Sequence, residues 1–175
     1  MGSSDIMNIF ILHSNPRIAA QMAADCHVVK MPIESWQMLS GQFPGHPCSQ
    51  WISSNGPARF WLYDHAVALC EEYTFRFGKT HAIQRRLQED FYQLDEWRER
   101  NLAFHCVKES EYEDIVSTAA LAMPHWFISL QEPTTVASYR RYYINKSKTL
   151  SSSKFRYTGR KPPQWLLDSG FVNPV

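Results

Sequence analysis

The sequence predicts a mainly α-helical protein that forms one compact domain. Its 175 residues are 44% hydrophobic and 20% charged, a balance typical of a globular chain with a single core. Apolar residues recur at spacings of three and four along several segments, as they do on one face of an α-helix. No apolar run approaches the roughly 18 residues that a membrane-spanning helix needs, so we expect a soluble protein without a membrane partner.

The N-terminal part is predicted to combine helices with one extended run. Residues 8–13 are apolar and predict either a short buried strand or an extended segment. A helix is expected from Pro16, because Asn15 can cap it and proline suits the first helical position. Pro32 is expected to kink the helical region, so that two segments meet there. Residues 41–57 are rich in glycine and proline and predict a long loop.

The strongest helical pattern covers residues 61–77, and Gly78 is expected to end that helix. Thr134 is a suitable first cap for another helix close to the C-terminus. Further helical segments are expected over residues 83–97, 117–121 and 135–145.

The chain divides into three parts by composition. Residues 1–6 resemble an added leader and are left out of the fold prediction, residues 7–150 are expected to form the helical domain, and residues 151–175 are expected to form a basic and aromatic tail that packs on the domain or extends from it. The four cysteines form no CxxC pair, which favours a reduced, cytoplasmic chain.

Positive charge is concentrated near the C-terminus although the net charge is only +1. Residues 138–161 hold eight Lys and Arg side chains and no Asp or Glu. Aromatic residues are interleaved with these bases, a pattern that suits nucleic acid because bases neutralise phosphates and rings stack on unpaired bases. The alternative is a core helix that buries its tyrosines and exposes its arginines to solvent.

One acidic residue is a candidate for catalysis. Glu34 follows His27 by seven residues, which is about two helical turns, so both side chains would lie on one helix face. Glu34 could then act as a general base or an electrostatic stabiliser, with His27 as its neighbour or a proton carrier. Alternatively, Glu34 lies in a first helical turn, where the helix dipole favours a carboxylate, and His27 is an interior histidine.

Other polar and aromatic side chains are candidates for lining a pocket, and we expect neither a metal nor a cofactor. The sequence has no HExxH motif and no GxxxxGK phosphate loop, so it favours neither a metalloprotease nor a nucleotide hydrolase. The pocket candidates are Asp25, His46, Trp51, His65, Arg76 and Lys79.

Two blocks of this sequence resemble the phage pyrimidine-dimer DNA glycosylases of the endonuclease V type. The first is residues 25–37, in which the spacing from Asp25 through His27 to Glu34 is similar to the helix that carries the family's catalytic glutamate. The second is the aromatic and basic run of residues 139–143 with Lys146. The resemblance implies a compact helical protein that kinks DNA and extrudes a nucleotide.

The resemblance also implies site residues. Glu34 would be the catalytic acid and His27 would orient it, while Gln37 stands where the family has an arginine. Contacts with DNA are expected from Lys30, Gln37, Arg140, Arg141, Tyr142, Lys146 and Lys148.

Three functions stay open from the sequence. The first is a DNA glycosylase, with weak lyase activity, that acts on damaged or modified pyrimidines. The second is a transferase that adds an amino acid or a similar group to an activated 5-hydroxymethylpyrimidine in DNA, which would need a small-molecule co-substrate. The third is a non-catalytic DNA-binding phage protein. In each case we expect a monomer that meets double-stranded DNA in the cytoplasm of a phage-infected bacterial cell.

Overall fold

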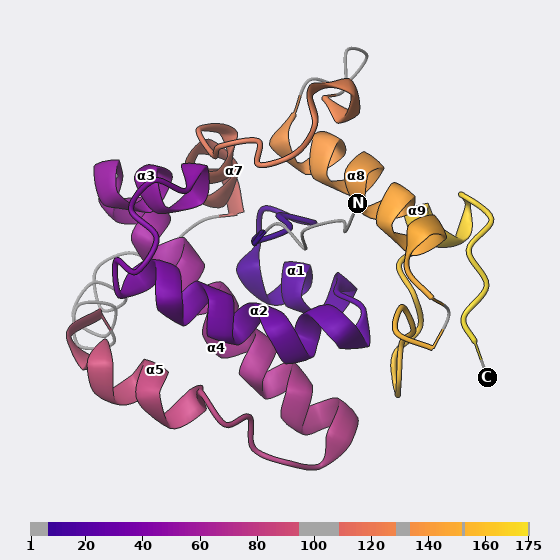
Figure 1. Ribbon diagram of the computed structural model, residues 1–175, viewed down its shortest axis with the longest axis horizontal. Helices are drawn as coiled ribbons and strands as arrows, with labels where there is room; N and C mark the ends of the chain where they lie inside the picture. Colours follow the sequence, from indigo (N-terminus) through magenta and orange to yellow (C-terminus); the bar gives the residue numbers. More distant parts are fainter. Residues whose placement is uncertain (1–6, 95–108, 129–133, 152, 175) are drawn as a thin grey trace.

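The computed structural model describes residues 7–94, 109–128, 134–151 and 153–174. Within these ranges the chain forms eight α-helices and one 3₁₀ helix and no strand, so the predicted mainly α class is confirmed (Figure 1). None of the helices in these ranges is both long enough and apolar enough to cross a bilayer. The helices are α1 (Pro16–Met22), α2 (Asp25–Leu39), α3 (Pro47–Ser54), α4 (Gly56–Phe77), α5 (Gln84–Asp90), α7 (Glu109–Ser117), η1 (His125–Phe127), α8 (Thr135–Thr149) and α9 (Gln164–Leu167).

Helix α4 is the longest helix, and both α1 and α2 pack on it (Figure 1). Two contacts show that α2 and α4 are antiparallel. Near the start of α4, Arg59 Nη2 donates to the carbonyl oxygen of Leu39 at the end of α2, 3.0 Å away. Near the end of α4, Arg76 Nη1 lies 2.9 Å from Asp25 Oδ1 at the start of α2. The two helices are therefore fixed to each other at both ends.

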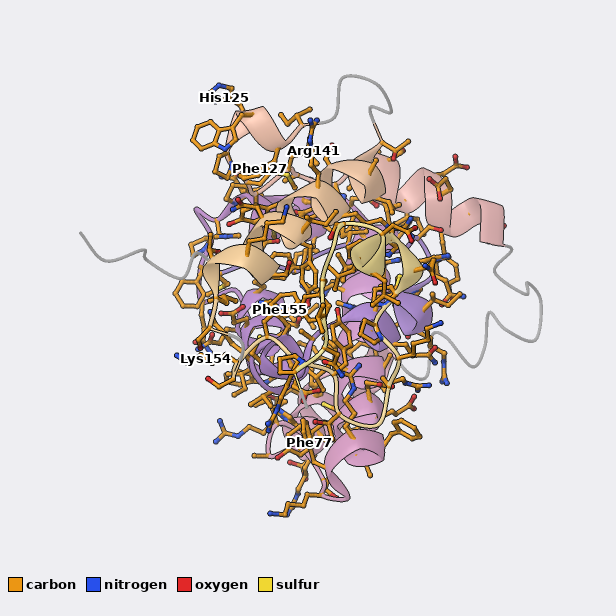
Figure 2. The ribbon with its side chains drawn as sticks, turned by 90° about the vertical axis from the view of Figure 1, so that its right-hand side faces the viewer. Phe77, His125, Phe127, Arg141, Lys154 and Phe155 are labelled. Carbon is orange, nitrogen blue, oxygen red and sulfur yellow. The ribbon has the colours of Figure 1, made fainter. Side chains whose placement is uncertain are left out.

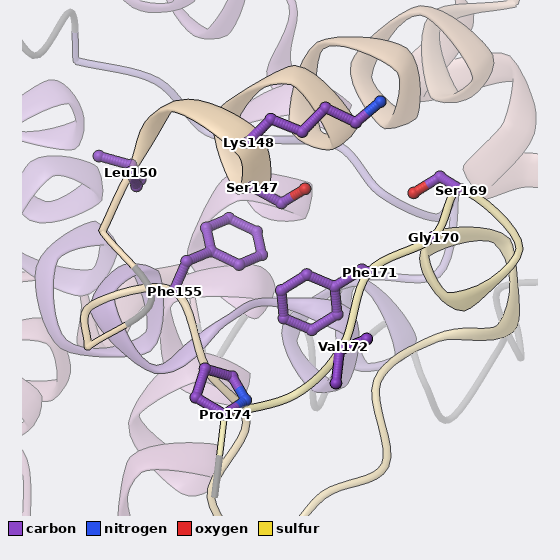
Figure 3. Close-up of a pocket in the computed structure, with 9 residues that line it drawn as sticks. All are labelled: Ser147, Lys148, Leu150, Phe155, Ser169, Gly170, Phe171, Val172 and Pro174. Atoms are coloured by element: carbon purple, nitrogen blue, oxygen red, sulfur yellow. The ribbon is translucent and has the colours of Figure 1, made fainter.

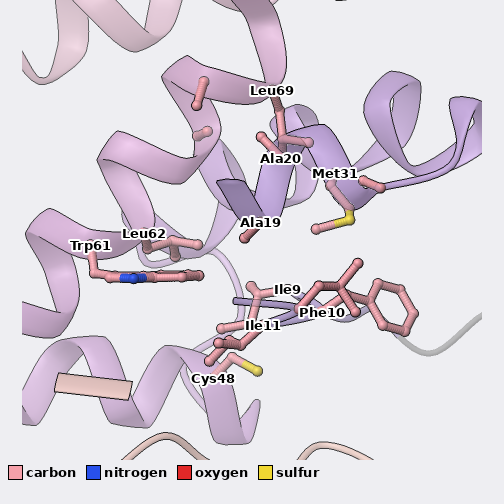
Figure 4. Packing of buried hydrophobic residues seen from close by; sticks show 14 of the residues in the cluster. Ile9, Phe10, Ile11, Ala19, Ala20, Met31, Cys48, Trp61, Leu62 and Leu69 are labelled. Carbon is pink, nitrogen blue, oxygen red and sulfur yellow. The ribbon is translucent and has the colours of Figure 1, made fainter. Parts of the chain in front are cut away.

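The N-terminal run lies in the centre of the core and is extended without forming a strand (Figure 4). The strand alternative is therefore wrong. Phe10 has a φ of 37°, in the left-handed region that side chains other than glycine rarely adopt. The buried Asn8 side chain supports this conformation, since its Oδ1 accepts from the Phe10 amide at 3.1 Å and its Nδ2 donates to the Ala122 carbonyl at 2.6 Å. Interactions of this kind hold a strained backbone in place.

Three helix predictions are confirmed by their end signals. Asn15 caps α1, accepting from the amides of Arg17 and Ile18. Gly78 ends α4 with a φ of 65°, which glycine adopts without steric cost. The Thr134 side chain accepts from the Ala137 amide at 3.1 Å and begins α8.

Other predictions about local structure are wrong. Pro32 does not divide the chain, because α2 continues through it with Met31, Pro32 and Ser35 buried. The predicted loop over residues 41–57 contains α3, since Pro47 occupies the first helical turn and His46 caps it, accepting from the Cys48 amide. The turn predicted over residues 117–121 is not helical beyond Ser117. The helix predicted over residues 83–97 forms as the shorter α5, and residues 95–97 lie outside the described part of the chain.

A buried network of charges joins α2, α4 and the C-terminal segment. Arg76 contacts Asp25 and also donates from Nε to Glu72 Oε1 at 2.7 Å. Arg160 binds Glu72 with two hydrogen bonds of 2.8 Å each. Thr158 donates to both carboxylate oxygens of Asp25, through its amide at 3.0 Å and its hydroxyl at 2.6 Å. The C-terminal segment is thus fixed to the helices by charge-assisted hydrogen bonds, which are stronger than neutral ones.

We predict that Glu72→Gln lowers the free energy of unfolding by about 1.5–3 kcal/mol at neutral pH, because the buried Arg76 guanidinium keeps only Asp25 as a carboxylate partner and Arg160 loses its charge-assisted hydrogen bonds. Burial alone would raise the pKa of the Glu72 carboxyl, but the hydrogen bonds and charges of Arg160 and Arg76 lower it below its usual value. This stability is therefore present above the ordinary pKa of 4.5 and is lost as the pH falls through the lowered value. Urea unfolding at several pH values measures both effects.

The neighbouring variant Glu71→Gln is the matched control. The Glu71 carboxylate lies 3.4 Å from Arg17, and both side chains are at least half exposed, so its loss should cost less than about 1 kcal/mol. Equal effects of the two variants would show that the network does not stabilise the fold.

Candidate active site

The carboxylate of Glu34 lies on α2 and keeps a small opening to solvent. Its side chain is 12% exposed, and its Oε1 lies 3.1 Å from Nζ of Lys30, whose side chain is 40% exposed. The two residues are four apart, so they lie on the same face of the helix, one turn from each other. The pair places a mostly buried carboxylate next to an ammonium group that solvent can reach.

The surroundings of Glu34 include α3. Burial raises the pKa of the Cys48 thiol to about 12, and the negative charge of Glu34 adds to the increase, so the two side chains lie in the same part of the molecule. Cys48 also interacts with Tyr139 of α8. His46 Nε2 lies 2.9 Å from the carbonyl oxygen of Met7. We call the pair of Glu34 and Lys30 the carboxylate site.

His27 lies two turns away from Glu34, in an aromatic cluster. Its side chain is buried, and its Nδ1 lies 2.7 Å from the hydroxyl oxygen of Tyr143, which also accepts from the Ala24 amide at 2.7 Å. The rings of Phe10 and Phe155 pack against the imidazole, at 4.7 and 5.8 Å between centroids. Seven residues along a helix correspond to about 10.5 Å. This placement is the one that the interior-histidine interpretation expects.

Several pocket candidates have structural contacts instead. Asp25 and Arg76 belong to the buried charge network. Trp51 is buried, and its Nε1 donates to Thr118 Oγ1 at 3.1 Å. Lys79 is exposed, just beyond the end of α4. Asp25, Trp51 and Arg76 thus make contacts between elements of the fold.

His65 is fully buried on α4, and its ring stacks on Trp61 at 5.0 Å between centroids. Neither ring nitrogen hydrogen-bonds to another of the described residues. Burial lowers the pKa of His65 to about 3. The imidazole is therefore neutral at physiological pH.

The basic residues of α8 divide into two groups. Arg140 turns inward, where its Nε donates to the Leu12 carbonyl at 2.8 Å. Arg141 and Lys148 are exposed. Lys146 lies over the ring of Tyr142, 5.6 Å from its centroid, and Tyr142 is only 6% exposed. Tyr142 is thus available to support a cation but not to stack on a base, and Gln37 on α2 is half-buried.

Sequence reasoning missed Trp126. This residue of η1 is 64% exposed, beside His125 at 5.1 Å between ring centroids. The next residue, Phe127, packs on Tyr142 of α8 at 5.0 Å and so anchors the exposed ring. Figure 2 shows His125, Phe127 and Arg141 at one end of the molecule, with Phe77 at the other end. The signal was the run of three aromatic rings after Pro124.

No family model, curated protein or solved structure matches this chain. Within the described residues, no group of three or more His, Cys, Asp or Glu side chains is arranged to hold a metal ion.

We predict that wild-type stability decreases between pH 6.5 and pH 3, by up to about 1.4 kcal/mol per pH unit, because the unfolded state protonates His65 and the folded state does not. His65→Leu should remove this part of the pH dependence and should leave stability at pH 7 within about 1 kcal/mol of the wild type, since it also removes two buried nitrogens without partners. Chemical unfolding across this range is the measurement. His125→Leu, at an exposed position, should keep the wild-type slope.

Proposed function

We propose that this protein is a DNA base-processing enzyme that acts on a pyrimidine nucleotide extruded from duplex DNA, and that its reaction is that of a DNA glycosylase. The observation that carries the proposal is the carboxylate site, where Glu34 is largely withdrawn from water yet still open, with the Lys30 ammonium 3.1 Å away. The sequence resemblance points to the same glutamate.

The proposed reaction needs one carboxylate and one cationic side chain. When a pyrimidine leaves the sugar, positive charge develops at C1′ and the ring oxygen, and a fixed carboxylate stabilises that charge. Glu34 would do this or direct a water molecule to C1′. Lys30 would hold the carboxylate in place and neutralise a phosphate close to the extruded nucleotide.

Binding and extrusion would use the surface of α8 and η1. Arg141 and Lys148 are exposed on α8 and suit phosphate contacts. Trp126 is exposed on η1, where the next residue, Phe127, packs on Tyr142 beside Arg141, and its apolar ring is of the kind that minor-groove proteins insert between base steps. Such a ring can occupy the gap that an extruded base leaves.

We predict that Glu34→Gln lowers the rate of base release by a factor of about 10² or more. The experiment incubates the protein with duplex oligonucleotides that contain photodimers or 5-substituted pyrimidines, and measures abasic sites. Glu89→Gln is the matched control, because Glu89 also pairs with a basic residue four positions away, Arg85, at 2.6 Å, on an exposed helix face.

The same reactions separate the functions that the sequence leaves open. Mass spectrometry of the digested nucleosides would show a lost base for a glycosylase and a heavier nucleoside for a transferase. If no oligonucleotide is changed, or if Glu34→Gln is as active as the wild type, the proposed function is wrong.

We also predict that Trp126→Ala weakens duplex DNA binding by about 1–3 kcal/mol, the range measured for one aromatic ring stacked on a base. Fluorescence anisotropy at constant salt measures the affinity. Tyr92→Ala removes a ring that is 54% exposed just after the end of α5 and should leave the affinity unchanged. Equal losses in both variants would indicate a general effect of surface aromatics.

A further inference from the structure

A concave site lies between the end of α8 and the C-terminal segment, and Glu34 is not among its lining residues. It is a cavity of about 250 Å³ (Figure 3). Nine residues line it: Ser147, Lys148, Leu150, Phe155, Ser169, Gly170, Phe171, Val172 and Pro174. All of them are in the described part of the chain, and none is Asp or Glu.

One side of the cavity is aromatic. The rings of Phe155 and Phe171 lie 5.6 Å apart between centroids at an angle of 70°, so the face of one ring meets the edge of the other. An apolar cavity of about 150 Å³ holds one benzene ring, so this volume suits a single six-membered ring with its substituents. Phe155 is fully buried and supports Phe171, which is partly exposed and therefore offers the ring on which a flat ligand can stack.

The other side of the cavity is polar. The hydroxyls of Ser147 and Ser169 each donate to a carbonyl of their own helical turn, at 2.7 Å, to Ile144 and Leu166 respectively. Their protons are therefore engaged, and their oxygens remain acceptors for a donor on a ligand. A ring N–H or amino group would satisfy them.

Lys148 adds positive charge at the rim (Figure 3). It is exposed and has no carboxylate partner among the described residues. An anion would therefore bind there without first breaking an ion pair. A ligand that suits this cavity therefore has a flat ring, a hydrogen-bond donor and a negative charge. A pyrimidine nucleotide has all three.

We propose that this cavity binds a pyrimidine nucleotide, with the base on the ring of Phe171, its N–H or amino group on the serine oxygens and its phosphate on Lys148. The nucleotide can be a free monophosphate or an unpaired residue of a DNA strand.

Calorimetric titration of the full chain with thymidine 5′-monophosphate tests the proposal. We expect binding that is stronger than that of thymidine, and none with inorganic phosphate alone. Lys148→Ala should weaken monophosphate binding about 10-fold and leave thymidine binding unchanged. Phe171→Leu, which keeps an apolar side chain, should weaken both ligands about 10-fold or more. The matched control is Lys161→Ala, an exposed lysine that does not line the cavity.

Two further experiments are needed. One identifies the source of the nucleotide, and the other tests this cavity independently of the proposed function. If an oligothymidylate of eight residues binds with the same Lys148 dependence and displaces the monophosphate, the ligand is a DNA strand. If it does not displace the monophosphate, the ligand is free. Glu34→Gln should bind the monophosphate like the wild type, so a failed activity assay and a failed titration are distinct results. Absent binding at millimolar concentration, tighter binding of guanosine monophosphate, or unchanged affinity in both cavity variants would overturn the proposal.

Discussion

The arrangement of the molecule depends on one buried guanidinium. Arg76 near the end of α4 contacts Asp25 at the start of α2, Glu72 on its own helix and the carbonyl of Gln21 at the end of α1. Since a buried charge is costly unless all its donors are used, these contacts fix where three helices meet. The antiparallel alignment of α2 then determines the position of Glu34 further along the same helix. Thr158 and Arg160 bind the same two carboxylates and place the C-terminal segment where it forms a wall of the cavity next to α8.

The basic C-terminal region serves the fold as well as any ligand. Of its eight Lys and Arg side chains, Arg140 and Lys146 contact buried groups of the helical body and Arg156 and Arg160 lie against the acidic network. Counting charges in the sequence therefore overstates the positive surface. On α8 the exposed cations are Arg141 and Lys148.

The sequence predicted elements whose signals are local. Asn15, Gly78 and Thr134 act within a turn of their own position, so the ends of α1, α4 and α8 could be read from residue types. Helix α3 was missed because proline and glycine suggest loops, whereas Pro47 begins a helix. Contacts between residues far apart in the sequence could not be predicted. Arg76 and Asp25 are 51 positions apart, and His27 and Tyr143 are 116 positions apart. For the candidate site, the sequence predicted roles for Glu34 and Lys30. It also predicted that His27 assists Glu34, whereas His27 contacts Tyr143. The exposure of Trp126 depends on tertiary packing and could not be predicted from the sequence.

If a pyrimidine extruded from the duplex reaches Glu34, zero-length photocrosslinking will locate it there. A duplex with one 4-thiothymidine would be irradiated with the protein, and the crosslinked tryptic peptide identified by mass spectrometry. A single peptide, residues 31–59, contains Glu34, His46 and Cys48. We expect the thiobase to crosslink to this peptide, also in Glu34→Gln, where binding persists without chemistry. Crosslinks confined to other peptides would contradict the account.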